Sequence, residues 1–324
     1  MNRITLISAL LAILFAMGKT ASAQDIYFSQ QYADKLSLNP AHPAIQGNSE
    51  ICVIMRQQFP QAQGGFKTYG ASYLQKINQC GIGIRAYGTT SGGAYTQNNF
   101  SAAYANMVRL SKKIKCSAAV EVAFATKNLK QNKLVYYSML DPLTGDIKGT
   151  PPSIEYTSPN TLAMSTGIIL YTKKSAAGLA AYNIAQYKIS STEGISKAFT
   201  GFVNHKIELK KTFRNHQTEP CYLIPNIIIR YQNNISSIQT GLHIDTPVIF
   251  GGLSHRLQTG AFTQHSIIAT IGVTIKNIQI GYGHDFNLSN TIKADYGAHE
   301  IAAKYIINNI KKNTNGKTIF CPAY

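Results

Sequence analysis

The sequence predicts an all-β protein, a transmembrane antiparallel β-barrel of about 14 strands with an N-terminal arm or plug and a C-terminal periplasmic tail. Three observations predict it: an export signal at the start, the lack of a long apolar run after that signal, and apolar side chains that alternate with polar ones over many short segments. The alternation is longest between Phe262 and Ile307. A chain with these features is expected to cross an outer membrane with strands.

Residues 1–23 have the three parts of a secretory signal peptide. Met1-Asn2-Arg3 carries the positive charge, a mainly apolar run extends from Ile4 to Gly18, and Ala21-Ser22-Ala23 is a small-residue cleavage site. Positions 20–24 contain no cysteine, so a lipoprotein anchor is not expected. The mature chain is therefore expected to begin at Gln24.

After Gly18 no stretch approaches the roughly 18 to 20 continuous apolar residues that a spanning helix needs. This excludes a helical membrane protein. An exported chain with 19 Tyr, 13 Phe and no Trp is then either a secreted β-rich protein or an outer-membrane barrel. Polar lumen-facing positions explain how such a barrel keeps a mean hydropathy near neutral.

The formal net charge is +17, and the basic residues are spread along the chain in short pairs. Four of these pairs fall at or just past the ends of expected strands: Lys112-Lys113, Lys173-Lys174, Lys210-Lys211 and Lys311-Lys312. No motif that interleaves aromatic with basic residues accompanies them, so no nucleic-acid partner is expected. The charge favours anionic head groups, and outer-membrane lipids are the expected surroundings.

The mature chain divides into an arm, a barrel and a tail. Residues 24–48 show little periodicity and form the arm or plug, residues 49–308 form the barrel, and residues 309–324 form a tail. A barrel of about 14 strands is wide enough that its lumen needs filling. The segment 24–48 and the loop 128–161 are the two candidates.

The expected strands are bounded by turn residues and share the two-residue period. They span residues 50–59, 66–76, 81–89, 97–109, 115–127, 162–172, 176–186, 199–210, 221–231, 235–244, 247–257, 262–275, 277–286 and 296–307. Connections on the side of the chain ends are short, with 211–220 the longest of them, whereas 128–161, 187–198 and 287–295 on the opposite side include the longest loop of the chain. Periplasmic turns and extracellular loops of outer-membrane barrels differ in this way.

The hairpin around Lys276-Asn277 sets the expected facing of the side chains. Ile271 and Val273 belong to an apolar face that meets lipid, while Ile268 is an exception on the polar face. A soluble sandwich fits this hairpin equally well. Charged residues inside strands favour the barrel, because Arg85, Glu121 and Glu208 would then point into a lumen that tolerates charge.

No catalytic, cofactor or metal site is expected, and the protein is predicted not to be an enzyme. His299-Glu300 lacks the second histidine of a zincin helix. The glycine pairs at 81 and 83 and at 281 and 283 indicate tight lumen packing rather than a phosphate cradle. The segment Asp141–Asp146 is a plain turn rather than a calcium loop, and the five cysteines lack the spacing of a zinc site.

Both ends of the mature chain carry short motifs in a fixed order. They are QDIYFSQQY at 24–32, LNPA at 38–41, IGYGHD at 280–285, YGAHEI at 296–301 and CPAY at 321–324. In letters, order and spacing this set resembles the PorP/SprF family of type IX secretion system membrane proteins. Residues 128–220 resemble the family only loosely.

The resemblance implies a non-enzymatic outer-membrane β-barrel of a Bacteroidota-type Gram-negative secretion and gliding machinery. Such a protein assists the secretion or surface attachment of adhesin-like cargo, and it contacts periplasmic ring and peptidoglycan-binding components. The motif residues are then candidates for partner docking: Phe28, Tyr32, Asn39, Pro40, Gly297, His299, Glu300, Cys321 and Pro322. Packing in the lumen or at its rim is the alternative role for the N-terminal members of this set.

Two other functions fit the same pattern. The first is an outer-membrane channel or transporter for small solutes, which requires an open lumen. The second is a secreted β-sandwich adhesin, which requires the apolar rows to be buried between two sheets rather than exposed.

Overall fold

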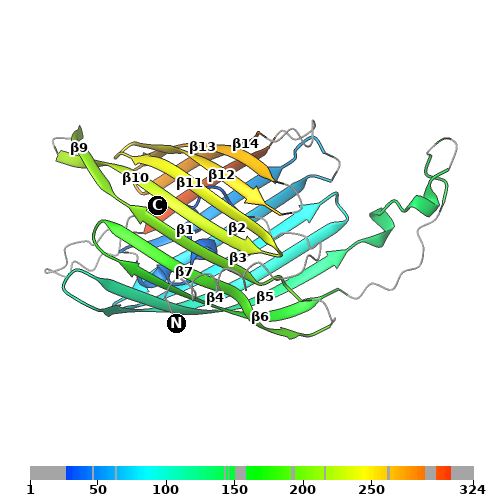
Figure 1. The fold of residues 1–324 in the computed structure, drawn as a ribbon, viewed down its shortest axis with the longest axis horizontal. Helices are drawn as coiled ribbons and strands as arrows, with labels where there is room; N and C mark the ends of the chain where they lie inside the picture. The colour runs from blue at the N-terminus through cyan, green and yellow to red at the C-terminus, as the bar shows by residue number, and fades with distance from the viewer. Residues whose placement is uncertain are drawn as a thin grey trace, which may run out of the picture.

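The computed structural model of the protein describes residues 27–45, 47–62, 64–141, 144, 146–149, 158–190, 194–214, 217–260, 263–288 and 297–307. These residues form one antiparallel sheet that closes on itself as a barrel (Figure 1). The strands are β1 (Ser49–Gln58), β2 (Phe66–Ile77), β3 (Cys80–Ser91), β4 (Tyr95–Arg109), β5 (Lys115–Leu129), β6 (Asn160–Tyr171), β7 (Ser175–Lys188), β8 (Ala198–His205), β9 (Ile207–Arg214), β10 (Gln217–Gln232), β11 (Ile235–Asp245), β12 (Ile249–Thr259), β13 (Gln264–Ile275), β14 (Ile278–Asn287) and β15 (Ala298–Ile307). The helices are short: α2 (Lys35–Leu38), η1 (His42–Ala44), η2 (Gln131–Lys133) and η3 (Tyr137–Met139).

Fourteen of the fifteen strands form the ring, and β9 lies outside it. Neighbours in the ring follow chain order, β8 pairs with β10, and the first strand closes on the last, with Ser49 opposite Ile307. The predicted barrel of about 14 antiparallel strands is confirmed. We call the end of the barrel at Ser49 and Ile307 the terminal end, and the opposite end the long-loop end.

One predicted strand is wrong. Residues 199–210 form two strands, because the chain leaves the ring at Lys206 and β9 pairs only with β10. Pro225 of β10 lies opposite this break: β10 pairs with β9 as far as Leu223 and with β8 from Asn226. Proline has no N–H to donate to a ladder, and at Pro225 the pairing on one side of β10 is interrupted.

The exposed fractions of the side chains confirm which side of each strand faces outward. Ile271 and Val273 are 61% and 40% exposed on the outside, whereas Ile268 is 1% exposed and points inward. Arg85 and Glu121 point into the lumen as expected and are buried. Glu208 does not, since it is exposed on β9 beyond the ring. The apolar rows thus lie on the outer surface of a closed barrel and not between two sheets.

Residues 27–45, here called the lumen segment, lie inside the barrel. Their backbone groups form hydrogen bonds with inward-facing residues on opposite sides of the ring. The Ser29 N–H donates to Glu300 of β15, and the Leu38 carbonyl accepts from Thr200 of β8. The loop with η2 and η3, the other candidate for filling the lumen, extends away from the barrel (Figure 1). In the part of the chain that the structure describes, no helix is long and apolar enough to span a membrane.

Candidate functional site

The candidate site is the interface between the lumen segment and the inner wall of the barrel. The segment is almost entirely buried, with Phe28, Leu36 and Asn39 at 4%, 0% and 0% exposure. Asp34 accepts from the backbone N–H of Ser37 and so caps the single turn of α2. The segment therefore keeps a compact shape inside a barrel wide enough to hold it.

One side of the lumen segment is held by a network of charged groups, here called the anchor network. Arg56 of β1 contacts Asp285 of β14 at 2.9 Å and Glu300 of β15 at 3.1 Å. Arg256 of β12 reaches the same Asp285 oxygen at 3.1 Å. Buried charges require such partners, and each of these four side chains has one.

The lumen segment completes this network. The backbone N–H groups of Ser29 and Gln30 donate to the two carboxylate oxygens of Glu300 at 2.8 and 2.6 Å. The Ser29 hydroxyl donates to Asp285 at 2.7 Å. Hydrogen bonds to ionised groups are about twice as strong as neutral ones. The anchor network therefore ties the segment to the closing strands of the barrel.

The network brings together motifs from both ends of the chain. Ser29 and Gln30 belong to the N-terminal motif, Asp285 ends the motif at 280–285, and Glu300 lies in the motif at 296–301. Ser29 and Glu300 are 271 positions apart in the sequence. Three motifs that are separate in the chain thus form one structural unit.

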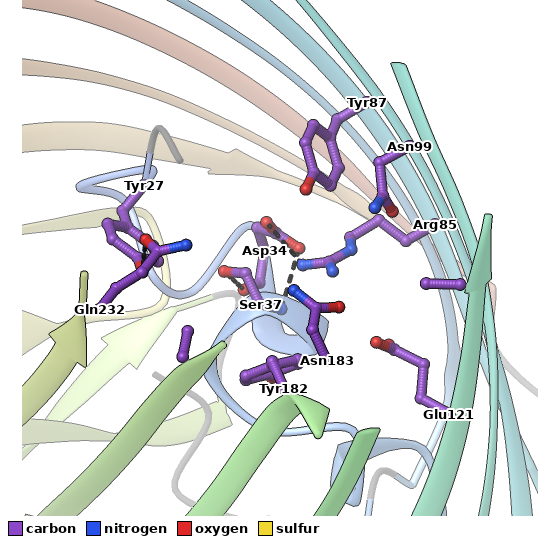
Figure 2. Close-up of a pocket in the computed structure, with 12 residues that line it drawn as sticks. Tyr27, Asp34, Ser37, Arg85, Tyr87, Asn99, Glu121, Tyr182, Asn183 and Gln232 are labelled. Atoms are coloured by element: carbon purple, nitrogen blue, oxygen red, sulfur yellow. Dashed lines mark hydrogen bonds and ion pairs between the residues drawn. The ribbon is translucent and has the colours of Figure 1, made fainter. Parts of the chain in front are cut away.

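The other side of the lumen segment faces a small polar pocket, shown in Figure 2. Asp34 reaches Arg85 of β3 at 3.7 Å, and Glu121 of β5 lies nearby on the pocket wall. Tyr182 of β7 donates through its hydroxyl to the Leu36 carbonyl at 2.6 Å. This pocket holds the middle of the segment by charge and by hydrogen bonds to its backbone.

Asn39 and its neighbours fix the last part of the lumen segment. The Asn39 side-chain amide donates to the carbonyls of Ile168 and Leu179 at 3.1 and 2.9 Å. Thr200 and Ser117 donate through their hydroxyls to the carbonyls of Leu38 and Ala41 at 2.7 and 2.8 Å, respectively. Carbonyls that would otherwise be buried without a partner are thereby satisfied.

Glycines of the wall make room for the lumen segment. A Cβ at Gly281 would overlap the Tyr32 hydroxyl, and a Cβ at Gly81 would overlap the backbone of Pro43. At Gly83 a Cβ would lie 2.8 Å from the Leu36 side chain. The expectation that these glycines allow tight lumen packing is confirmed.

Burial changes the ionisation of two side chains in the lumen segment. Burial, together with the nearby positive charge of Lys35, lowers the pKa of His42 to about 3. The neutral ring stacks on Phe202 with centroids 5.6 Å apart. Burial, followed by the negative charge of Glu300, raises the pKa of Tyr32 above its ordinary value. Both side chains are therefore uncharged at neutral pH.

The structure brings some of the predicted site residues together and leaves others apart. Phe28, Tyr32, Asn39 and Pro40 are buried in the lumen, which is the packing role given above as the alternative to docking. Glu300 belongs to the anchor network, and Gly297 precedes β15 with a φ of +71°, where a Cβ would overlap the Asp285 carbonyl. His299 does not join the site, because its side chain is exposed on the outer wall. Cys321 and Pro322 lie outside the described residues.

His299 contacts other residues on the outer wall. Its Nδ1 lies 2.7 Å from the Tyr282 hydroxyl and 3.2 Å from Nδ1 of His284. Within the described ranges no group of three or more His, Cys, Asp or Glu side chains could hold a metal ion. The four cysteines that the structure describes, Cys52, Cys80, Cys116 and Cys221, are free thiols.

The sequence did not identify Arg56, Arg256 or Asp34 as members of the site. It also did not identify Asp285 as an ion-pair partner. Arg56 and Arg256 occupy inward positions within strands, the same signal that singled out Arg85 and Glu121. Asp34 has no such signal, because the lumen segment lacks a regular period.

Comparisons with known proteins agree with this architecture. A family model described as "Type IX secretion system membrane protein PorP/SprF" matches residues 20–305. No curated protein matches the chain.

Several solved structures are similar to the chain. The CymD monoaromatic hydrocarbon channel is 10% identical with a TM-score of 0.50, over 89% of this chain and 95% of CymD. The P. putida toluene transporter TodX is 9% identical with a TM-score of 0.49, over 87% and 94%. CdiB from Acinetobacter baumannii is 8% identical with a TM-score of 0.42, over 80% of this chain, which spans 60% of CdiB.

At 10% identity the likeness to CymD concerns the barrel fold alone. The family match is of a different kind, because it spans the lumen segment, the anchor network and nearly the whole barrel. The protein therefore belongs to the PorP/SprF family of type IX secretion system membrane proteins and is a β-barrel of the outer membrane.

Proposed function

We propose that the protein is a non-enzymatic scaffold of the type IX secretion machinery whose lumen segment acts as a plug. In this role it assists the secretion or surface attachment of cargo proteins and contacts periplasmic ring components. The observation that carries the proposal is the anchoring of residues 27–45 across the lumen, from Glu300 on one wall to Thr200 on the other. A barrel filled in this way offers its rims and outer wall to partners.

A solute channel is the second candidate, and it differs from the scaffold in the state of the lumen. Planar-bilayer recording of the purified full chain separates the two. A scaffold gives no sustained conductance, whereas a channel for small solutes conducts in the same buffer. Sustained single-channel steps from the unmodified protein at pH 7 would overturn the scaffold proposal.

The partner contacts need a second experiment in cells of the source organism. Mild cross-linking of the outer membrane, followed by purification of this protein, should recover periplasmic components of the secretion machinery and cargo. Deletion of residues 311–324 tests the contribution of the predicted tail. If the deleted form recovers the full partner set, the tail does not dock these partners. If the intact chain recovers none of them, the proposed role is wrong.

A further inference from the structure

The terminal end of the barrel carries a strongly basic cavity of about 740 Å³. Its charged lining consists only of basic side chains, here called the basic mouth: Arg109, Lys112, Lys113, Lys115, Lys173 and Lys174. The neutral residues Tyr171 and Thr172 complete the lining, and no aspartate or glutamate of the described residues takes part. The basic mouth is built from the ends of β4, β5 and β6 and from the two turns that follow β4 and β6.

Within the ladder, the basic mouth places like charges against each other. Arg109 and Lys115 are direct partners in the register of β4 and β5, and Lys115 is the partner of Tyr171 in β5 and β6. Like charges directly opposite each other destabilise a sheet. This arrangement therefore has an unfavourable energy until a negative charge joins it.

The described carboxylates do not supply that charge. None of the ion pairs in the described part of the chain includes any of the six cations of the basic mouth. Three buried cations of the lumen differ in this respect, since Lys35, Arg56 and Arg85 each have a carboxylate partner. Isolated lysine pairs at turns are ordinary solvated residues, but here two pairs and two strand residues converge on one cavity.

The basic mouth faces the lumen rather than the lipid. Arg109 continues the inward row of β4 that contains Ala103 and Ala105, and Lys115 continues the inward row of β5 that contains Ser117. Tyr171 is 2% exposed and belongs to the apolar cluster that includes Leu38 and Ile45 of the lumen segment. A ligand in the cavity would thus lie next to the part of the lumen segment that contains Leu38 and Ile45.

From these observations we infer that the basic mouth binds an acidic peptide segment of a partner protein at the terminal end. Six cations match several carboxylates, and the volume falls within the range of roughly 300–1,000 Å³ typical of sites for ligands larger than a simple anion. The inward direction of Arg109 and Lys115 favours a segment that enters the mouth over a lipid head group at the outer wall. That the partner is a periplasmic component of the secretion machinery rests on the proposed function.

The test uses the full chain in nanodiscs of phosphatidylcholine and a fluorescein-labelled octaglutamate peptide, followed by fluorescence anisotropy. The test variant is Lys112→Gln/Lys113→Gln/Lys173→Gln/Lys174→Gln, whose four changes lie in exposed turns. The matched control, Lys67→Gln/Lys130→Gln/Lys133→Gln/Lys197→Gln, removes the same charge at or near the long-loop end. A heat-modifiable gel shift checks that both variants are folded.

We expect the wild type and the control to bind octaglutamate with the same affinity, and the test variant to bind at least tenfold more weakly. The affinity of the wild type should fall steeply with salt, because the contacts are ionic. Equal binding by the test variant and the wild type, or no preference for octaglutamate over octaserine, overturns the inference. Loss of octaglutamate binding in nanodiscs with phosphatidylglycerol, which would indicate a lipid site, also overturns it.

The outcome is separable from that of the proposed function. If octaglutamate binds but cross-linking recovers no secretion partner, the basic mouth is a peptide-binding site and the proposed role in type IX secretion is wrong. If the wild type and the test variant recover the same secretion partners and octaglutamate does not bind, the role in secretion stands. The basic mouth is then not the surface that binds these partners.

Discussion

At the scale of single residues, Arg56 is the cation that joins both carboxylates of the anchor network. Arg56 neutralises two carboxylates, Asp285 and Glu300, and it also donates to the Ser29 hydroxyl at 2.8 Å. Burying a pair of charges is costly by itself, but removing one member of a buried pair is costlier, because the other remains uncompensated. Arg56 is therefore the residue whose loss should release the lumen segment.

We expect Arg56→Met to destabilise the docked lumen segment by about 3–5 kcal/mol, the usual effect of breaking a buried ion pair. Trypsin cleavage after Lys35 measures it, since Lys35 is 4% exposed and becomes accessible only when the segment leaves the lumen. Cleavage should be roughly 150- to 5,000-fold faster than in the wild type. Lys148→Met, which breaks the exposed pair with Asp141, is the control and should change the rate little. A rate unchanged in Arg56→Met would contradict the anchoring role.

The buried histidine of the lumen segment predicts a pH dependence. His42 has a pKa of about 3 when docked and near 6.5 when the segment is in water. The undocked state therefore binds more protons between these values, so docking is fully stable above about pH 6.5 and weakens as the pH falls toward 3. At pH 4.5 the protonation of His42 in the undocked state weakens docking by about 3 kcal/mol, because each pKa unit corresponds to about 1.36 kcal/mol.

Planar-bilayer recordings at pH 7 and pH 4.5 measure this effect as the fraction of time spent open. The wild type should show openings at pH 4.5 that are absent at pH 7. His42→Asn removes the titrating imidazole, so the opening of this variant should respond less to pH, even if its absolute level differs. An identical pH response in both proteins would show that the effect does not come from His42.

Ile271 provides a test of which face meets lipid. It lies near the middle of β13 and is 61% exposed, so Ile271→Arg places a charge in the hydrocarbon region. We expect a loss of about 2–4 kcal/mol in the free energy of unfolding in liposomes, measured by urea titration. Gln279→Arg on the inward row of β14 is the comparison and should cost much less. Similar losses in both variants would refute the facing of this hairpin.

At the scale of elements, the lumen segment and the wall have complementary sequences. The wall carries glycines where the segment comes closest, as Gly281 does beneath Tyr32. The segment carries short turns rather than a long helix or strand, so its carbonyls remain available to wall hydroxyls such as those of Ser117 and Tyr182. The fit between them is specific in both shape and hydrogen bonding.

Gly281→Val should displace the lumen segment without opening the ring, because the new side chain occupies the place of the Tyr32 hydroxyl. We expect conductance to appear in planar bilayers where the wild type has none. Gly201→Val is the control, since it adds the same bulk on the outer wall next to the flexible Leu179 side chain. Conductance equal to that of the control would indicate that the segment tolerates the intrusion.

Element boundaries show where sequence reasoning succeeds and where it fails. The alternation of side chains predicts each strand of the ring, because one face meets lipid and the other the lumen. It does not predict that the chain leaves the ring at Lys206, since the alternation of residues 199–210 continues through the break. The break depends on pairing with β10, which is a long-range property.

At the scale of the whole molecule, the fold was predictable and the interior was not. The period of the strands gives the barrel, and the short motifs give the family. Neither decides whether residues 24–48 or the loop 128–161 fills the lumen, because the contacts of the lumen segment join positions far apart, as Asp34 joins Arg85 and Ser29 joins Glu300. For motif residues such as Phe28 and Tyr32 the sequence leaves docking and lumen packing open, and the structure buries them in the lumen.

The position of Glu300 ties the lumen segment to the closure of the ring. The carboxylate that holds Ser29 and Gln30 lies on β15, the strand that also seals the ring against β1. An open sheet in which β15 is not yet paired with β1 has neither the seam nor a placed carboxylate for Ser29 and Gln30. We therefore expect closure of the ring and seating of the lumen segment to be coupled, so that a variant that weakens the seam also loosens the segment.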